Sequence, residues 1–466
     1  MTTINRTKVK ELIQRENERY ADERPKSREL FEQAQSSLIF GVPMAGMNEW
    51  VGDFPIYVEA GDGAYLTDVD GNRYLDLCLG DSGSMCGHTP QATIDAVTTQ
   101  INRGLTFWLP TEDSIWVGKE LTRRFGLPYW QVYLRASDAN NAALSVARDV
   151  TQRYPIIVFN GSYHGHVPES RLGLMNDNIW PEPRGKHDMV DIRDGVVWRG
   201  THAQGIEPTT STGTRVIDFN DLDALEKALS TEDIACVLCE PAMTNVGIIM
   251  PDPGYHEQLR RLTRKYGTLL IIDETHTICG GPYGYTKPWK LEPDIYTIGK
   301  PVAGGIPTAF MGIGEDVQKV LQSQKVGKAL KSIGGGTLSG NALSLAAARA
   351  TLEHVLTEAT YEYTISLCEK LVDGVDGIIK ANDLPWHVLR LGCRAEWRWS
   401  KTPPRNGKEA RAATDSALHE LVHLYFMNRG ILLTPPHSMV LIPPECTVED
   451  IDHHNSVFAE FVSELV

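Results

Sequence analysis

Residues 268–277 read TLLIIDETHT, and this stretch decides the fold of the chain. Its apolar half has the length and composition of a buried β-strand, and its polar half begins where that strand ends. Residues 294–300, DIYTIGK, repeat the arrangement and end on Lys300. Open α/β sheets bind ligands at the carboxyl ends of their strands, so we expect Asp273 and Lys300 to lie at one edge of a sheet.

A carboxylate and an amine at one sheet edge suit pyridoxal 5'-phosphate (PLP). The amine would hold the cofactor as a Schiff base, and the carboxylate would pair with the protonated pyridine nitrogen that makes the ring an electron sink. Strands that end in aspartate and lysines that follow glycine are also common in ordinary loops. These two segments alone therefore leave both interpretations open.

The composition limits the class of protein. A chain of 466 residues with 42% hydrophobic content predicts a large globular core and more than one domain. It has neither an apolar stretch of membrane-spanning length nor the apolar segment of a signal peptide, so we expect a cytoplasmic protein with no membrane partner. The net charge of −15 argues against nucleic acid as a partner.

The cysteines suggest neither a disulfide framework nor a metal site. Eight of them are scattered along the chain. Cys236 and Cys239 have zinc-knuckle spacing, but they sit in an apolar run with no second such pair. A buried strand explains them better, and no metal is assigned.

The order of elements predicts an α/β fold. From about residue 89 to 338, helices alternate with apolar strands, which implies a mostly parallel, seven-stranded-type sheet between helices. The expected strands are residues 131–135, 155–159, 235–239, 268–272, 295–298 and 309–313. Residues 176–213, rich in Gly, Pro, Arg and Thr, are expected to be irregular and to form a lid or binding loop.

Three regions follow from this pattern. Residues 1–75 should form a helix and a hairpin that pack with a smaller domain, with the hairpin turn at Asp70-Gly71 and a peripheral charged segment at 15–26. Residues 76–344 should form the large cofactor-binding domain. Residues 345–466 should form the small α+β domain, with a strand near 395–399.

Further segments place polar groups at strand ends. Ala136 and Ser137 begin a helix, whose free N–H groups and dipole favour a phosphate. Tyr163 follows a strand and could stack on a pyridine ring, and Glu240 and Asn245 could reach the ring hydroxyl. The glycine cluster at 334–340 could approach an anion closely. Each signal is weak alone, and their shared position at strand ends strengthens them.

Together these motifs resemble the class III, fold-type I PLP-dependent aminotransferases, most closely their glutamate-semialdehyde aminomutase branch. The resemblance runs from residue 27 to the end of the chain. It rests on Glu240-Pro241, Asp273-Glu274 and Lys300 and on four stretches: SRELFEQAQ at 27–35, GAYL with DVDGNRY at 63–74, YHGH at 163–166 and GTLSGN at 336–341.

The resemblance implies roles for the cofactor residues. Lys300 would be the Schiff-base lysine and general acid/base, and Asp273 would pair with the pyridine nitrogen. Tyr163 would stack on one face of the ring, and Thr275 would press the other, where the family usually has valine. Thr337 would reach the phosphate of a neighbouring subunit, which implies a homodimer with shared active sites.

The phosphate cup departs from the family pattern. By the resemblance it falls on Ala136 and Ser137 in place of a Gly-Thr pair, with Asp138 for a glutamate and Arg135 for a serine. Backbone donors survive these changes. The side-chain hydrogen bonds to phosphate do not follow from the resemblance.

Two residues are candidates for substrate contacts. Arg394, on a predicted strand of the small domain, could clamp a carboxylate, although a solvated surface arginine is the alternative. Asp81 stands where the aminomutase branch tends to carry tryptophan, and a carboxylate facing the substrate would disfavour a second negative charge nearby. The alternative is that Asp81 only caps the following turn. The loop after His166 also lacks the small lid of that branch, and both differences argue against true glutamate-semialdehyde aminomutase activity.

The expected function is therefore that of a PLP-dependent aminotransferase. It would move an amino group from an amino acid, possibly a β- or ω-amino acid, to a keto acid or aldehyde through a Lys300 Schiff base. The alternative is an aminomutase or epimerase, an isomerase that uses the same lysine. A protein that binds PLP without catalysis is disfavoured because Lys300 and Asp273 are both present.

Overall fold

The computed structural model describes residues 4–171, 189–193, 196–200, 213–324 and 331–466. The chain forms two compact units. The large unit comprises Ala92–Thr357 together with the short segment Pro404–Ala412. The small unit comprises Met1–Gln91, Glu358–Pro403 and Ala413–Val466. Each unit is therefore built from pieces that are distant in the sequence.

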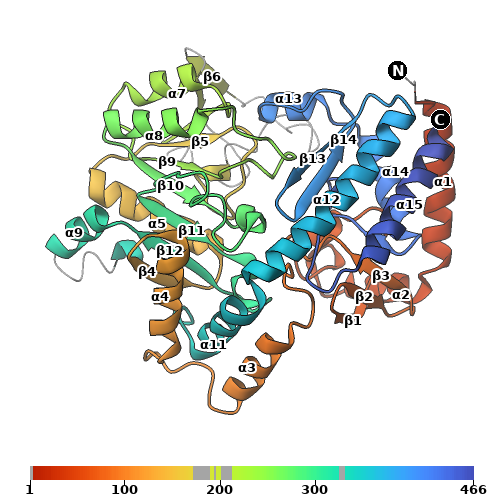
Figure 1. Cartoon of the computed structure of the whole chain (residues 1–466), viewed down its shortest axis with the longest axis horizontal. Coiled ribbons are helices and arrows are strands. Elements are labelled where there is room, and N and C mark those ends of the chain that lie inside the picture. Colours follow the sequence, from red (N-terminus) through yellow and green to blue (C-terminus); the bar gives the residue numbers. More distant parts are fainter. Residues whose placement is uncertain (1–3, 172–188, 194–195, 201–212, 325–330) are drawn as a thin grey trace. The chain divides into compact units, whose positions relative to one another are not determined.

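A single sheet organises the described part of the large unit (Figure 1). Its strand order is β4-β12-β11-β10-β9-β5-β8-β7-β6. The five central strands from β11 to β8 run parallel, and the other neighbours pair antiparallel. The strands are β4 Tyr129–Tyr133, β5 Ile156–Phe159, β6 Met189–Arg193, β7 Val196–Gly200, β8 Thr214–Ile217, β9 Cys236–Cys239, β10 Leu269–Asp273, β11 Ile295–Ile298 and β12 Ala309–Ile313. The predicted α/β fold with a mostly parallel sheet is confirmed.

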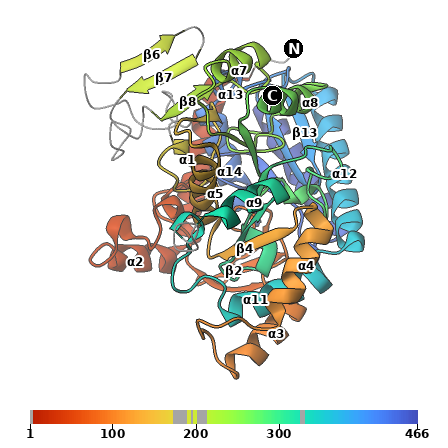
Figure 2. The same cartoon turned by 90° about the vertical axis from the view of Figure 1, so that its left-hand side faces the viewer.

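The sheet is wider than the sequence predicted. All six expected strands are present, but residues 176–213, expected to be irregular, contribute the antiparallel hairpin β6–β7. This hairpin extends the sheet beyond β8 (Figure 2). Valine and isoleucine on both sides of the Asp194-Gly195 pair were the available signal, since Asp-Gly favours a two-residue hairpin turn. The rest of that stretch lies outside the described residues.

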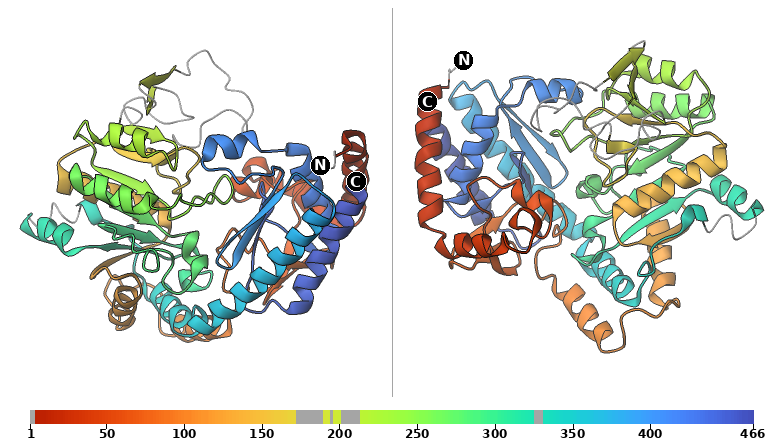
Figure 3. Two further views of the ribbon diagram at one scale, coloured as in Figure 1. Left: turned by 45° about the horizontal axis from the view of Figure 1, so that its top comes forward. Right: turned by 180° about the vertical axis from the view of Figure 1, so that it is seen from behind.

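Helices cover both faces of this sheet. Helix α5 (Ala136–Thr151) connects the edge strand β4 to β5, so the chain moves across the sheet toward β8. Helices α7 (Leu222–Leu229) and α8 (Tyr255–Lys265) connect β8 to β9 and β9 to β10, so there the chain moves back toward β4. Right-handed crossovers therefore put α5 on one face and α7 and α8 on the other (Figure 3). The remaining helices of the large unit are α3 Gln91–Ile101, α4 Asp113–Phe125, α9 Glu315–Ser323, α11 Ala342–Ala350 and α13 Gly407–Ala412.

The core beneath α5 explains how that helix approaches the sheet. Its buried face is made largely of small residues, which let the helix pack closely on the strands. These residues are Ala139, Ala142, Ala143, Val146 and Ala147. They pack in one cluster with strand residues such as Ile156, Leu238 and Ile271. The first turn of α5 is thereby held at the edge where the parallel strands end.

The small unit contains two further sheets. In the first, β1 (Val58–Asp62), β2 (Tyr65–Asp68) and β3 (Arg73–Asp76) form a meander, and β15 (Ile431–Leu432) pairs with β3. The predicted hairpin around Asp70-Gly71 is thus confirmed. The second sheet contains β13 His387–Leu391, β14 Arg394–Arg398 and β16 Met439–Leu441. The helices are α1 Arg6–Asp22, α2 Pro25–Ala34, α12 Glu358–Ala381, α14 Ser416–Met427 and α15 Val448–Leu465.

The charged segment at residues 15–26, predicted to be peripheral, is partly buried. Glu16 and Arg24 are each 1% exposed. Arg24 donates to the Tyr74 hydroxyl at 2.8 Å and to Asn428 Oδ1 at 3.1 Å. Asn428 in turn donates to Glu16 Oε2 at 2.9 Å. The charge pattern did not reveal the burial of Glu16 and Arg24, because their hydrogen-bond partner Asn428 lies 412 and 404 positions away in the sequence.

Candidate active site

Asp273 ends strand β10 as a buried carboxylate with three hydrogen-bond donors. His164 Nδ1 lies 2.9 Å and Asn140 Nδ2 lies 2.8 Å from Oδ2, and the Thr275 backbone N–H donates to Oδ1 at 3.0 Å. Burial alone raises the pKa of Asp273, but the hydrogen bond and charge of His164 and the hydrogen bonds from Thr275 hold it at about 2. The carboxylate is therefore ionised at neutral pH.

Asn140, on α5, fixes this arrangement from the helix side. Its amide oxygen accepts a hydrogen bond from Thr297 Oγ1 at 2.6 Å, and its amide nitrogen also donates to the His164 carbonyl at 3.1 Å. Both Asn140 and Thr297 are fully buried. Side chains from α5, β11 and the segment after β5 thus hold Asp273 in one orientation.

Lys300 follows the neighbouring parallel strand. The register pairs Asp273 with Thr297, so both chains leave the sheet at the same edge, as the sequence predicted. Lys300 has a φ of +54°, in the left-handed region. This conformation costs a non-glycine residue about 1 kcal/mol, and such strain concentrates at functional sites. The lysine amine makes a hydrogen bond with His276 Nε2.

A second buried carboxylate lies behind His276. Glu240, just after β9, accepts a hydrogen bond from Thr244 Oγ1 at 2.5 Å, and that hydroxyl lies 2.6 Å from His276 Nδ1. Burial raises the pKa of Glu240 to about 7, against the opposing charge of His164 and the hydrogen bond from Thr244. Glu240 and Asp273, at one sheet edge, therefore differ in protonation near neutral pH.

The start of α5 forms an anion cradle with the loop after β5. Ser137 lies in the first turn of α5, where free N–H groups and the helix dipole favour an anion. Its hydroxyl accepts a hydrogen bond from the His166 N–H at 3.0 Å. Gly165 has a φ of +81°, and a Cβ there would lie 2.2 Å from Ser137 Oγ. Only glycine fits this approach.

The two unusual residues of the predicted phosphate cup pair with each other. Arg135 Nε lies 3.1 Å from Asp138 Oδ1; the arginine side chain is exposed and the aspartate side chain is half-buried. The Asp138 charge is thus offset by a neighbouring cation. Ala136 packs against Gly299, where a Cβ would come within 3.0 Å of the Ala136 Cβ. This contact ties the helix start to the residue before Lys300.

Three buried polar atoms around these groups have no hydrogen-bond partner among the described residues. They are His164 Nε2, Thr275 Oγ1 and Glu240 Oε1. Leaving such an atom unsatisfied costs about 1–3 kcal/mol, so their clustering at one edge points to a polar ligand. With an ionised carboxylate, an amine and an anion cradle, the site fits a pyridine ring that carries a phosphate.

The structure places the other predicted residues as follows. Tyr163 is half-buried beside His164. Asn245 Nδ2 donates to the Gly161 carbonyl at 3.3 Å. Thr337 is exposed in the turn before α11. All three residues belong to the large unit, and their cofactor contacts stay predictions.

The two predicted substrate residues belong to the small unit. Arg394 begins β14 and is 1% exposed, so it is not a solvated surface arginine. It donates to Ser82 Oγ and to Met439 Sδ, the latter at 2.6 Å. Asp81 precedes Ser82 and has a φ of +49°. Arg394 therefore supports the turn that presents Asp81, and the substrate role of each residue stays a prediction.

Four residues of the site were not predicted from the sequence: His276, Thr244, Asn140 and His164. His276 lies within the TLLIIDETHT stretch, and its signal was a titratable side chain three residues beyond Asp273. His164 belongs to a motif quoted for its tyrosine. The sequence carried no signal for Thr244 or Asn140, because their contacts join separate strand ends.

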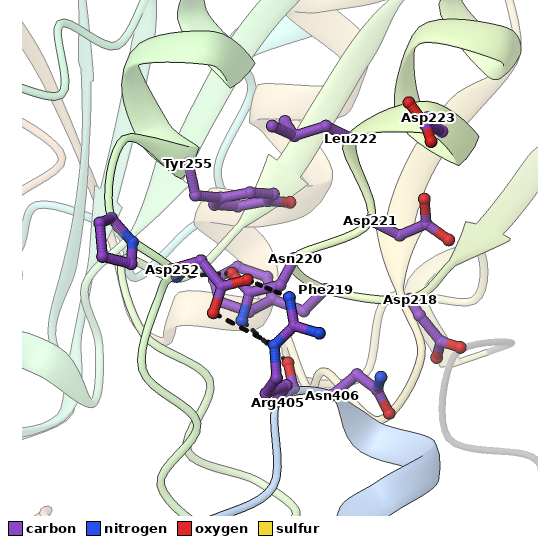
Figure 4. A pocket seen from close by; sticks show the side chains of 11 residues that line it. Asp218, Phe219, Asn220, Asp221, Leu222, Asp223, Asp252, Tyr255, Arg405 and Asn406 are labelled. Atoms are coloured by element: carbon purple, nitrogen blue, oxygen red, sulfur yellow. Dashed lines mark hydrogen bonds and ion pairs between the residues drawn. The ribbon is translucent and has the colours of Figure 1, made fainter.

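A pocket of about 530 Å³ lies elsewhere on the large unit and includes neither Lys300 nor Asp273. Figure 4 shows Arg405 directed at Asp252, with which it pairs through Nε and Nη2. Asn220 Nδ2 donates to the Arg405 carbonyl at 2.9 Å. Nearby, Arg411 Nη2 donates to Asn160 Oδ1 at 2.7 Å. These bonds fasten Pro404–Ala412 to the large unit, so the pocket marks a structural junction.

Comparison with known families accounts for this geometry. Residues 46–462 match the model of the family described as aminotransferase class-III. The chain belongs to this family. Class-III enzymes use PLP, so PLP is the cofactor of this enzyme. The binding of PLP by Asp273, Lys300 and Ser137 stays a prediction. The predicted family and cofactor are confirmed.

Individual class-III relatives cover nearly the whole chain. It is 30% identical over 437 residues to glutamate-1-semialdehyde 2,1-aminomutase of Desulfitobacterium hafniense, covering 92% of this chain and 96% of the relative. A solved glutamate-1-semialdehyde aminomutase from Pseudomonas aeruginosa PAO1 is 42% identical, with a TM-score of 0.90 and complete coverage of both chains. An omega-transaminase from Sphaerobacter thermophilus shares the fold at 24% identity, with a TM-score of 0.84 and coverage of 94% and 98%.

The described residues include neither a membrane-spanning helix nor a cluster of metal-ligating side chains. No helix there has both the length and the apolar content needed to cross a bilayer. No group of three or more His, Cys, Asp or Glu side chains in those ranges is placed to hold a metal ion. All eight cysteines are buried, and Cys236 and Cys239 lie in β9 as predicted.

Proposed function

We propose that this class-III enzyme is a PLP-dependent aminomutase, an isomerase that moves an amino group within its substrate. The observation that carries the proposal is the 42% identity, with complete coverage of both chains, to the aminomutase of Pseudomonas aeruginosa. The relative in Desulfitobacterium hafniense carries the same name. The sequence alone favoured net transfer of the amino group to a keto acid. The aminomutase now takes its place as the first choice.

Each residue of the site has a task in this proposal. Ser137 and the start of α5 hold the phosphate, and Asp273 keeps the pyridine nitrogen protonated because its carboxylate stays ionised. Lys300 binds the cofactor covalently and, once released, moves a proton to and from the substrate carbon. When bound, PLP supplies an electron sink for the negative charge that this proton removal leaves. Tyr163 and Thr275 flank the ring.

Net aminotransfer is the second candidate because of Asp81. This residue stands where the aminomutase branch tends to carry tryptophan. A carboxylate facing the substrate would disfavour a negatively charged substrate group beside it. Such an enzyme would take an amino acid, such as a β- or ω-amino acid, and a keto acid or aldehyde. In either reaction Arg394 would bind a substrate carboxylate.

The active unit in this proposal is a homodimer. Thr337 is exposed, as a residue that reaches a partner's phosphate must be before assembly. Several large apolar side chains of the large unit are also exposed: Ile101, Leu105, Phe107, Trp108 and Leu109. Contiguous exposed apolar residues of this kind mark protein interfaces. Sedimentation of the PLP-loaded protein tests this point, and a monomer at micromolar concentration would contradict it.

The reaction type is tested with the purified, PLP-loaded protein and a panel of α-, β- and ω-amino acids that includes amino aldehydes. The visible absorbance of the cofactor and the mass of the products are followed together. An isomerised substrate with no keto product supports the aminomutase. Conversion of the cofactor to its amine form with a matching keto product would instead identify an aminotransferase. The Lys300→Ala variant serves as the inactive control.

A further inference from the structure

Four side chains of the large unit form a continuous hydrogen-bonded chain from Lys300 to Glu240. Lys300 Nζ bonds to His276 Nε2, and His276 Nδ1 lies 2.6 Å from Thr244 Oγ1. The same hydroxyl lies 2.5 Å from Glu240 Oε2. His276 is 8% exposed, and Thr244 and Glu240 are still less exposed. The path therefore runs through the protein interior, away from bulk water.

Every link in this chain can carry its proton in either direction. With Glu240 ionised, Thr244 donates to Glu240, His276 Nδ1–H donates to Thr244, and His276 Nε2 accepts from the Lys300 ammonium. With Glu240 protonated, each donor becomes the acceptor, and His276 Nε2–H donates to a neutral lysine amine. Passing from the first state to the second moves one proton from Lys300 to Nε2, one from Nδ1 to Thr244, and one from Thr244 to Glu240.

We propose that Glu240 stores the proton that Lys300 releases, and that His276 and Thr244 relay it between them. The inference rests on the proposed role of Lys300 as the PLP-binding lysine. His276, Thr244 and Glu240 act here as positioning and relay residues, because they reach the chemistry through Lys300. The exchange is neutral overall, since one internal carboxylate gains the proton that one internal amine loses.

The surroundings of Glu240 let both states exist near neutral pH. Burial disfavours its charge most strongly, and the nearby Asp273 carboxylate adds to this effect. His164 opposes them, and His276 Nδ1 lies 4.0 Å from Oε2. Cys239 adjoins it on β9, and burial raises the pKa of this thiol well above its usual range, so it stays neutral. The resulting pKa of about 7 makes Glu240 able both to give and to take a proton.

Such a store solves a specific problem for Lys300. A lysine amine attacks a carbonyl or takes a proton from carbon only when it is neutral, whereas in water it is mostly protonated. Releasing the proton to an internal carboxylate avoids opening the site to solvent. The same proton can return when Lys300 must again act as an acid.

The decisive comparison uses Thr244→Val and Thr244→Ser in the PLP-loaded protein. Valine has nearly the shape of threonine but no hydroxyl, so it breaks the relay, whereas serine keeps the hydroxyl. The readout is the pH midpoint at which the visible absorbance of the bound cofactor changes. We expect Thr244→Val to move this midpoint by about one pH unit or more, a tenfold change in proton affinity. Thr244→Ser should keep the wild-type midpoint. Equal midpoints in both variants would overturn the relay.

Infrared spectroscopy tests the proton store separately. The C=O stretch of a protonated carboxyl group, assigned by its loss in Glu240→Gln, should titrate near neutral pH in the wild type. Its midpoint should shift in Thr244→Val and in Lys300→Met, and it should be unchanged in Thr244→Ser. If the midpoint of the carboxyl band is the same in Lys300→Met as in the wild type, the proposal is overturned, whether or not the wild type binds PLP. Failure of the wild type to develop a visible band with PLP would contradict the proposed function, and the infrared result would still decide the relay.

Discussion

His164 Nδ1 lies 2.9 Å from Asp273 Oδ2, and this contact sets the charge at the centre of the site. Burial would by itself favour the neutral acid, but the histidine reverses that preference. Asn140 shares the same oxygen at 2.8 Å, so the carboxylate can neither rotate nor be hydrated freely. A negative charge is thus held in a nearly dry location, where it would act most strongly on the pyridine nitrogen of the proposed cofactor contact.

Replacing Asp273 by asparagine should lower activity by about 100-fold or more, the range seen when a charge-stabilising group is removed from an active site. Asparagine keeps the size and most hydrogen bonds but cannot hold the pyridine nitrogen protonated. Steady-state rates with the best substrate of the panel measure the effect. Asp316→Asn is the matched control because Asp316 is almost fully exposed. A loss of less than tenfold in Asp273→Asn would contradict the assigned role.

The left-handed backbone of Lys300 predicts an unusual order of stability. Lys300→Gly should be more stable than Lys300→Ala by about 1 kcal/mol, because glycine adopts a φ of +54° without the Cβ clash. Elsewhere glycine is normally the less stable of the two. Urea unfolding of both cofactor-free variants measures the difference. Should alanine prove as stable as glycine, the strain inferred at this position is absent.

Gly165→Ala should weaken PLP binding by displacing Ser137 from the anion cradle, because the new Cβ would lie 2.2 Å from Ser137 Oγ. Gly126→Ala provides a control matched in backbone, since both glycines have a φ of +81° but nothing lies within 4 Å of a Cβ at Gly126. Both variants place alanine at the same positive φ. Fluorescence titration with PLP should therefore show a raised Kd for Gly165→Ala alone, and equal Kd values would disprove the cradle.

Glu240 should make the protein less stable as the pH rises. Its pKa is about 7 in the folded state against 4.5 for the ordinary group, so between these values the folded state binds more protons. The free energy of unfolding then falls as the pH rises through this range, by up to about 3 kcal/mol in total. Glu240→Gln is neutral at every pH and should remove this fall.

Urea unfolding at about pH 5, 6, 7 and 8 measures the effect. Glu257→Gln is the control, because Glu257 is exposed in the first turn of α8. The wild type and the control should share one pH dependence, and Glu240→Gln should show a flatter one. Parallel curves for all three proteins would mean that Glu240 is ionised in the folded state at neutral pH.

Features that depend on local pattern were predictable from the sequence. The apolar run before Asp273 and the run before Lys300 have strand length, and the ends of parallel strands share an edge. The Asp70-Gly71 turn likewise predicted the β2–β3 hairpin. The wider sheet went unrecognised because Asp194-Gly195 lies within a stretch whose composition is typical of loops.

The second layer of the site was not predictable, because it depends on which side chains meet across distant segments. Asn140 contacts Asp273 over 133 positions of sequence, and Thr244 contacts His276 over 32. Neither Asn140 nor Thr244 stands in a local pattern that sets it apart from other polar residues near a strand or helix end. Their importance comes from the hydrogen-bond partners that the fold supplies.

The fastening of Pro404–Ala412 to the large unit also bears on how the chain is made. Gly407 lies so near the Asn160 carbonyl that a Cβ there would come within 2.0 Å of its oxygen, so this segment has one place to dock. During translation, all strands of the large sheet leave the ribosome before residue 404 does. The large unit therefore stays incomplete until Pro404–Ala412 is synthesised, and Asp252 and Asn160 lack their contacts with this segment until then. A nascent chain arrested shortly before this segment should be more sensitive to protease near these residues than one arrested after it.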